Sequence, residues 1–306
     1  MRAATGRSAG PRTRLADALG RWTCRLAACL ALLLLAACSS VRLGYANADT
    51  LLVRALDSYF DLDDAQTRLA RDEVRALLAW HRATELEQYA RLLGDAGRRV
   101  EGAVSAHEVL ALHEGINQRL ALVGERAAPA LAELALTLRP AQLEHLARKL
   151  AKDTARARRE LPPADSPRAL DARVERYAER LESWLGGLSE TQRARLRAAL
   201  ADDPASPHWW LGEREQRERD LVTLLRRVAA EQPPAAVASA WLRTFFAEQR
   251  LPADAERRAR ILDFRRDNSA LLAELLNSAS PRQKSRLVRR LRDYADDFTA
   301  LAADAG

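Results

Sequence analysis

Residues 170–188 read LDARVERYAERLESWLGGL, and the spacing of their apolar side chains decides the fold of this chain. From Leu170, the apolar residues recur at 174, 177, 181, 184 and 188, in alternating steps of four and three. Such steps place all six side chains on one face of an α-helix with 3.6 residues per turn. The stretch therefore predicts an amphipathic helix that packs against other helices.

The same spacing recurs at residues 109–123 and 287–301, and no alternating strand pattern of useful length occurs anywhere. Proline and glycine interrupt the helical stretches, and both residue types break or begin helices. We expect an all-α fold, a multi-helix antiparallel bundle of roughly ten helices with corners at these residues. The expected corners are Pro162-Pro163 with Pro167, Gly186-Gly187, Pro204 with Pro207, Pro233-Pro234, Pro252 and Pro281.

A short motif recurs at the expected helix starts. A capping residue is followed three positions later by Gln or Glu, as in Ser189-x-x-Gln192. In such a capping box each side chain bonds the backbone N–H of the other residue, which satisfies two otherwise unpaired donors. The intervals between occurrences exclude a regular repeat period. The further occurrences are Asp63-x-x-Gln66, Ser105-x-x-Glu108 and Ser280-x-x-Gln283, and Arg139-x-x-Gln142 keeps all but the cap.

The first 37 residues have the features of a bacterial lipoprotein signal peptide. An arginine-rich start precedes an apolar run, Leu26–Ala36, and then the sequence Leu35-Ala36-Ala37-Cys38. Eleven residues are too few to span a bilayer, which takes about 20. Cleavage by an ordinary signal peptidase after Ala37 is the alternative. We expect cleavage before Cys38 and lipid attachment to its sulfur, and Ser39 at the next position favours sorting to the outer membrane.

This leader carries most of the net positive charge. The whole chain has a net charge of +7, but residues 1–37 hold six arginines and one acid, Asp17. Without them, 43 basic and 41 acidic residues remain, a net charge of +2. We therefore expect no nucleic-acid partner, and we interpret Arg156-Ala157-Arg158-Arg159 and residues 286–292 as solvated helix faces.

We expect residues 38–46 to be a lipid-anchored tether and residues 47–303 to be the helical domain. At about 3.3 Å per residue the tether spans roughly 30 Å at most, so the domain works close to the membrane. Cys24 and Cys29 lie in the leader, which leaves Cys38 alone and excludes a disulfide framework. The prolines at 161–167 mark a possible joint, either between two domains or at a corner of one.

The sequence offers no catalytic group, metal site or cofactor site that we would predict. The five histidines form no zinc motif, and there is no glycine-rich phosphate loop. Asp61-Leu62-Asp63-Asp64 resembles the start of a calcium loop but lacks its later ligands, and a helix start explains the acids better. Adjacent helix residues cannot both face one core, so one of Trp209 and Trp210 should be exposed or pack on a loop. This pair is the candidate partner-contact site.

Several stretches resemble a family of uncharacterised proteobacterial lipoproteins. They include Cys38-Ser39-Ser40-Val41-Arg42-Leu43-Gly44-Tyr45, Asn47–Leu51, Asp61–Gln66, Trp80–Leu86 and Leu138–Leu150. The family is a domain of unknown function. The resemblance implies a lipoprotein with a helical fold, and it implies no activity and no site residues.

We therefore expect a non-enzymatic lipoprotein, anchored on the periplasmic side of the outer membrane, that binds or scaffolds envelope proteins. A holdase-like periplasmic chaperone is the alternative, because Leu188-Ser189-Glu190-Thr191-Gln192 resembles the Leu-Thr-x-x-Gln motif of small periplasmic helical chaperones. Against it, residues 38–306 contain no methionine, which promiscuous binding surfaces often present. An enzyme of unrecognised class ranks third among the hypotheses, because no cluster of titratable residues stands out that would support catalysis.

Overall fold

The computed structural model describes residues 40–164, 166–203 and 206–303. The chain divides into two compact units, Met1–Ala46 and Asn47–Gly306. In the first unit the described part is helix α2, Ser40–Ala46, so this helix occupies most of the segment expected to be a tether. The expected signal peptide and Cys38 lie outside the described residues. Among the helices that the structure describes, none combines the length and the apolar character that crossing a membrane requires.

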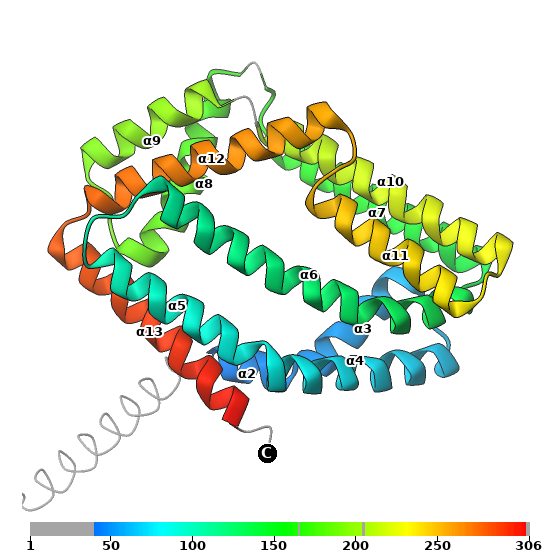
Figure 1. The fold of residues 1–306 in the computed structure, drawn as a ribbon. Helices are drawn as coiled ribbons and strands as arrows, with labels where there is room; N and C mark the ends of the chain where they lie inside the picture. Colours follow the sequence, from blue (N-terminus) through cyan, green and yellow to red (C-terminus); the bar gives the residue numbers. More distant parts are fainter. Residues whose placement is uncertain (1–39, 165, 204–205, 304–306) are drawn as a thin grey trace, which may run out of the picture. The chain divides into compact units, whose positions relative to one another are not determined.

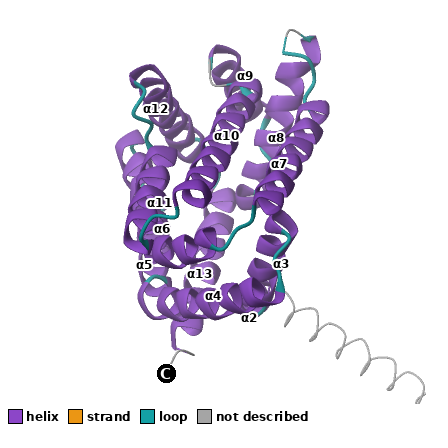
Figure 2. Ribbon diagram, turned by 90° about the vertical axis from the view of Figure 1, so that its right-hand side faces the viewer, coloured by secondary structure: helices purple, strands orange, loops and turns teal. Residues whose placement is uncertain are grey.

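The second unit is built from helices and, in its described residues, has no strand (Figures 1 and 2). The described residues of both units form twelve helices, somewhat more than the roughly ten expected, and α2 is one that the sequence did not predict. The helices of the second unit are α3 (Ala48–Phe60), α4 (Asp64–Thr84), α5 (Leu86–Val100), α6 (Ala106–Leu136), α7 (Pro140–Glu160), α8 (Pro167–Leu185), α9 (Glu190–Asp202), α10 (Pro207–Glu231), α11 (Ala235–Arg250), α12 (Ala255–Asn277) and α13 (Pro281–Ala303).

Three pairs of long helices run antiparallel. In the pair α5 and α13, the ring of Tyr89 lies 6.1 Å from that of Phe298, and Gly97 faces Leu291 further along. Gly124 and Glu125 of α6 face Phe246 and Arg243 of α11. Glu144 and Arg158 of α7 pair with Arg226 and Glu215 of α10. Figure 1 shows α6 running across the middle of the unit, with the other helices around it.

Three buried apolar clusters stabilise this arrangement, and every member lies beyond residue 47. The first joins α6, α7, α10 and α11 and includes Leu146 and Val228, which are almost fully buried. The second joins α5 and α13 to the end of α8, around Leu185 and Leu291. The third joins α8, α9 and α12, around Leu196. Because the apolar stripes supply these clusters, the second unit contains its own core.

Four helix starts meet in two pairs, through the glutamines of the capping motif. Gln66 at the start of α4 and Gln142 at the start of α7 are each 3% exposed and exchange hydrogen bonds, Nε2 to Oε1, of 3.2 and 2.7 Å. Gln192 of α9 and Gln283 of α13 do the same at 3.4 and 3.0 Å. The capping boxes are present as expected, and the glutamines in addition join corners that are far apart in the sequence.

The corner between α8 and α9 depends on Gly186. Its φ of 87° lies in the left-handed region, where a side chain would be strained. The N–H of Gly186 bonds the carbonyl of Glu182 and ends α8, and Ser189 then caps α9. Because the chain turns at Gly186, Gln192 at the start of α9 lies within hydrogen-bonding distance of Gln283.

Candidate functional site

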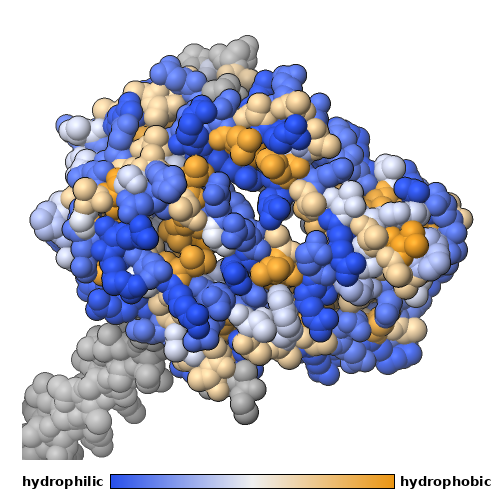
Figure 3. Space-filling view, in the orientation of Figure 1, coloured by the Kyte–Doolittle hydropathy of each residue, from blue (hydrophilic) through white to orange (hydrophobic). Residues whose placement is uncertain are grey.

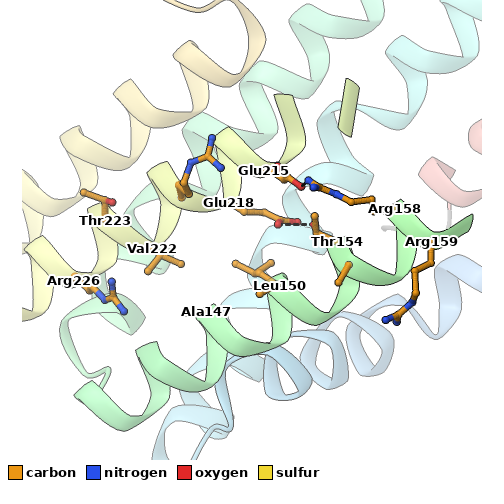
Figure 4. A pocket seen from close by; sticks show the side chains of 13 residues that line it. Ala147, Leu150, Thr154, Arg158, Arg159, Glu215, Glu218, Val222, Thr223 and Arg226 are labelled. Atoms are coloured by element: carbon orange, nitrogen blue, oxygen red, sulfur yellow. Dashed lines mark hydrogen bonds and ion pairs between the residues drawn. The ribbon is translucent and has the colours of Figure 1, made fainter. Parts of the chain in front are cut away.

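An open groove lies between α7 and α10 (Figure 4). Its volume is about 840 Å³, within the range of sites that bind small molecules or peptide segments. Both helices present side chains to it along several turns. The lining residues are Ala147, Leu150, Ala151, Thr154, Ala155, Arg158 and Arg159 of α7, and Glu215, Glu218, Arg219, Val222, Thr223 and Arg226 of α10.

The groove exists because one face of α7 carries small side chains. Ala147, Ala151 and Ala155 follow one another at steps of four, so they lie on the same side of the helix. Leu150 of α7 and Val222 of α10 complete the apolar part of the lining. The alanines are too short to fill the space between the two helices, which leaves an apolar floor open to a partner.

Ion pairs close the groove near both ends. Arg158 pairs with Glu215 across the two helices, as Figure 4 shows, and Arg226 pairs with Glu144 at 2.6 Å. Glu144 and Arg158 are fourteen residues apart on α7, so at 1.5 Å per residue the two crossings are about 21 Å apart. The groove between them is therefore about four helical turns long.

About one turn from the Arg158–Glu215 pair, Glu218 joins the two helices. The hydroxyl of Thr154, which is 6% exposed, donates to Glu218 Oε2 at 2.7 Å. Arg214 Nε donates to Glu218 Oε1 at 2.8 Å, and this hydrogen bond raises the pKa of Arg214. Both carboxylate oxygens are thus engaged, and Glu218 fixes the position of α10 on α7.

The remaining charge of the groove is positive. Four arginines and two glutamates line it. Arg159 and Arg219 form no ion pair with the described residues, so the lining has two positive charges in excess. An apolar floor with cationic edges suits a segment that presents an apolar stripe beside acidic side chains.

Tyr59, Lys149 and Asp153 form a polar cluster that ties α3 to α7. The Tyr59 hydroxyl donates to Asp153 Oδ2 at 3.1 Å, and Lys149 Nζ lies 3.6 Å from the same oxygen. Burial raises the pKa of Tyr59, and the hydrogen bond to Asp153 raises it further. The phenol therefore keeps its proton at neutral pH and acts as a hydrogen-bond donor rather than as a nucleophile.

The structure places Trp209 and Trp210 at the start of α10, outside the groove lining. Both residues are partly buried, and the sequence predicted that one of them would be exposed or would pack on a loop. Trp210 packs edge-on against Phe264 of α12 at 5.1 Å, and the Arg260 guanidinium lies 5.5 Å from the Trp209 ring. Both rings are half-buried because residues of the neighbouring helix α12 pack on them.

Asp61–Asp64 form a helix start, as the sequence indicated. Asp63 caps α4 by accepting from the backbone N–H groups of Ala65 and Gln66. Its hydrogen bonds to the Gln66 backbone and to Arg139 lower the pKa of Asp63. Across the described ranges, no three His, Cys, Asp or Glu side chains gather in a way that could hold a metal ion.

Sequence reasoning missed the groove. It assigned Arg158 and Arg159 to a solvated helix face, and the structure places both at the edge of the groove. The usable signal was the alanine spacing on α7, since three small residues at steps of four leave a trough beside any helix that packs there. The partner helix α10 was not predictable from that signal.

Residues 58–235 match the model of a family of unknown function, DUF6279. The chain belongs to this family. The matched segment of DUF6279 includes α7, α10 and therefore the whole groove, together with Trp209 and Trp210, and it ends before α12 and α13. Comparisons with curated proteins and with solved structures found no match.

Proposed function

We propose that this protein is a proteobacterial lipoprotein, an antiparallel helical bundle anchored through lipid on Cys38 to the periplasmic side of the outer membrane. There it binds envelope proteins and is not an enzyme. The lipoprotein signal and the resemblance described above support the anchor. The short segment between Cys38 and α3 keeps the bundle near the membrane, where envelope proteins are its available partners.

The α7–α10 groove is the observation that carries the binding role. It combines an apolar floor, a length of about four helical turns and an excess of positive charge at its edges. We infer that the partner presents a helical or extended segment with an apolar stripe flanked by acidic residues. Most titratable side chains that line the groove are engaged in ion pairs. This favours a binding role over a catalytic one.

Site-specific photocrosslinking in the bacterial envelope tests this role. A photoreactive residue at Ala155, which is exposed in the groove, should capture a small set of defined envelope proteins. The matched control is the same residue at Ala259, an exposed alanine of α12. If both positions capture the same proteins, or if Ala155 captures none, the groove is not the binding site.

A holdase-like chaperone is the second candidate, and one observation favours it. Leu120 and Leu122 of α6 are 56% and 42% exposed, and Leu262 of α12 is 45% exposed. Figure 3 shows apolar side chains around the hollow beside α6. Exposed leucines could bind unfolded chains without selectivity, whereas the groove would select its partners. The two candidates therefore differ in the range of proteins bound.

A further inference from the structure

Helix α13 begins with a dense run of basic residues. Between Pro281 and Arg292 there are six cations and no acid. Arg282, Arg286, Arg289 and Arg292 are exposed and follow one another at steps of four, three and three, so they form one stripe along about 15 Å of the helix. Figure 3 shows strongly hydrophilic side chains over the end of the unit where α5 and α13 lie.

Within the described residues, none of the six cations forms an ion pair. Elsewhere in the unit, arginines on helix surfaces commonly pair with acids, as Arg156 does with Glu160 and Arg227 with Glu231. Lys284 donates to the carbonyl of Gly102 at 2.9 Å, and Arg290 lies over the ring of Trp184 at 5.0 Å. The four arginines of the stripe have no such partner and are exposed, and the side chain of Arg286 lies beside Gly186 at the corner between α8 and α9.

The stripe also lies where positive charge is least favourable for the fold. The first turn of α13 contains no acid, although the exposed N–H groups of a helix start favour negative charge. Arg282 and Arg286 add their charge to that of the helix start instead of neutralising it. No acid within residues 281–292 compensates this positive charge, and an external anion would do so.

The buried side of α13 fixes the direction of the stripe. Leu287 and Leu291 pack into the cluster shared with α5 and α8, so the arginines face away from it. An open depression of about 770 Å³ beside the stripe is lined by Lys284, Arg289 and Arg292, with Glu101 as the one acid in its lining. Apolar side chains of Ala279, Pro281 and Val288 also line the depression, whereas the stripe itself contains only arginines.

We propose that the stripe of Arg282, Arg286, Arg289 and Arg292 docks the domain onto the anionic phospholipid headgroups of the membrane. A plane of anionic headgroups matches unpaired, solvated arginines that have no apolar floor between them. A protein segment would need apolar contacts in addition, which the α7–α10 groove has and the stripe lacks. The inference rests on the proposed membrane attachment, because a lipid anchor on Cys38 would hold the domain at a surface of phospholipid headgroups.

Vesicle cosedimentation of residues 39–306 tests the proposal without the lipid and without the arginines of the leader. This piece contains all three core clusters, so it keeps the folded unit. It should bind phosphatidylethanolamine vesicles that contain phosphatidylglycerol, and should not bind vesicles of phosphatidylethanolamine alone. High salt should release it, because the attraction is electrostatic.

The decisive variant replaces Arg282, Arg286 and Arg289 by glutamine. It should bind the anionic vesicles roughly 100-fold more weakly, since each basic residue near an anionic surface contributes about a factor of five. The control replaces three other exposed, unpaired arginines by glutamine, Arg54, Arg68 and Arg71, and should bind nearly as well as the wild type. Replacing the stripe by lysine should preserve binding.

Three results would overturn the proposal. Equal losses in the α13 variant and in the control would mean that total charge acts, and not the stripe. Loss of binding with lysine as well as with glutamine would mean that the positive charge of the stripe does not carry the binding. Full vesicle binding by the glutamine variant, with loss of an acidic crosslinked protein, would assign the stripe to a protein partner. Crosslinking at Ala155 and lipid labelling of Cys38 test the proposed function separately.

Discussion

Gln66 and Gln142 hydrogen-bond each other in both directions although 76 residues separate them. In each side-chain amide the oxygen accepts hydrogen bonds and the NH2 group donates them. Gln66 Oε1 accepts from the backbone of Asp63, and its Nε2 donates to the carbonyl of Thr137; Gln142 Nε2 donates to the carbonyl of Asp61. The pair therefore joins the start of α4 to the start of α7 through two fully bonded, buried side chains.

Replacing Gln66 by alanine should lower the free energy of unfolding by about 1–3 kcal/mol, because Gln142 and the carbonyl of Thr137 lose buried partners. Urea unfolding measures the change. In the Gln66→Ala background, Gln142→Ala should lower the free energy of unfolding by less than it does in the wild type. A double-mutant cycle should give a coupling energy of at least about 0.5 kcal/mol. The control Gln118→Ala, at an exposed position of α6, should change stability little. Strict additivity of the pair would contradict the structure.

Glu213 should be among the most costly acidic residues to remove. Its side chain is 9% exposed and forms three hydrogen bonds with Arg257, which join α10 to α12. Glu213→Ala leaves a partly buried guanidinium unpaired and should destabilise by about 3 kcal/mol. The exposed pair of Arg91 and Glu87 gives the comparison, since Glu87→Ala should change stability by less than about 0.5 kcal/mol. Thermal or urea unfolding that finds equal effects would argue against this contact.

Stability should decrease as the pH falls below about 6.5, through His81 and His113. Desolvation lowers the pKa of both imidazoles from 6.5, that of the partly buried His81 and that of the more exposed His113, for which the charge of Arg265 lowers it further. Below pH 6.5 the unfolded chain therefore binds more protons than the folded one, and protonation favours unfolding. Urea unfolding of the wild type at neutral and mildly acidic pH should show this loss. In a variant with His81→Gln and His113→Gln the loss should be smaller, and an unchanged pH dependence would rule out these two residues as its source.

Cys38→Ala should abolish lipid attachment and release or misprocess the protein while the helical unit stays folded. Acyl chains contribute about 0.8 kcal/mol per buried methylene, so several chains anchor a protein almost permanently. Labelling with a radioactive fatty acid and fractionation of the envelope check this. Recovery of the variant in the outer-membrane fraction, at wild-type mobility, would place the anchor elsewhere.

The purified domain should be a poor general suppressor of aggregation. A holdase needs apolar surface that many unfolded chains can share, whereas Trp209 and Trp210 are half-buried against each other and against Phe264. Light scattering of several denatured proteins measures the effect. Protection of unrelated proteins at near-stoichiometric ratios, unchanged by Trp209→Ala with Trp210→Ala and reduced by Leu120→Ser with Leu122→Ser, would favour the chaperone over the scaffold.

The helical fold could be predicted from local patterns. Apolar steps of three and four marked the packed faces of α8 and α13, but Leu120 of the stripe at 109–123 is 56% exposed. Capping residues such as Ser105 and Ser189 marked helix starts, because capping acts within one or two turns of the chain. The surroundings of the tryptophan pair could not be predicted, for the complementary reason. The sequence shows that two adjacent residues diverge on α10, and it does not show that α12 covers them.

By itself the sequence determined that the chain from residue 47 onward is helical, where most of those helices begin, and that Cys38 follows a lipoprotein-like signal. Only the tertiary structure decided that Gln66 meets Gln142, that the alanine face of α7 opens into a groove beside α10, and that the arginines of α13 are left without acids. Capping and periodicity are local properties of the backbone. Pairing of distant corners and pairing of charges depend on which helix faces pack together, and the whole chain decides that packing at once.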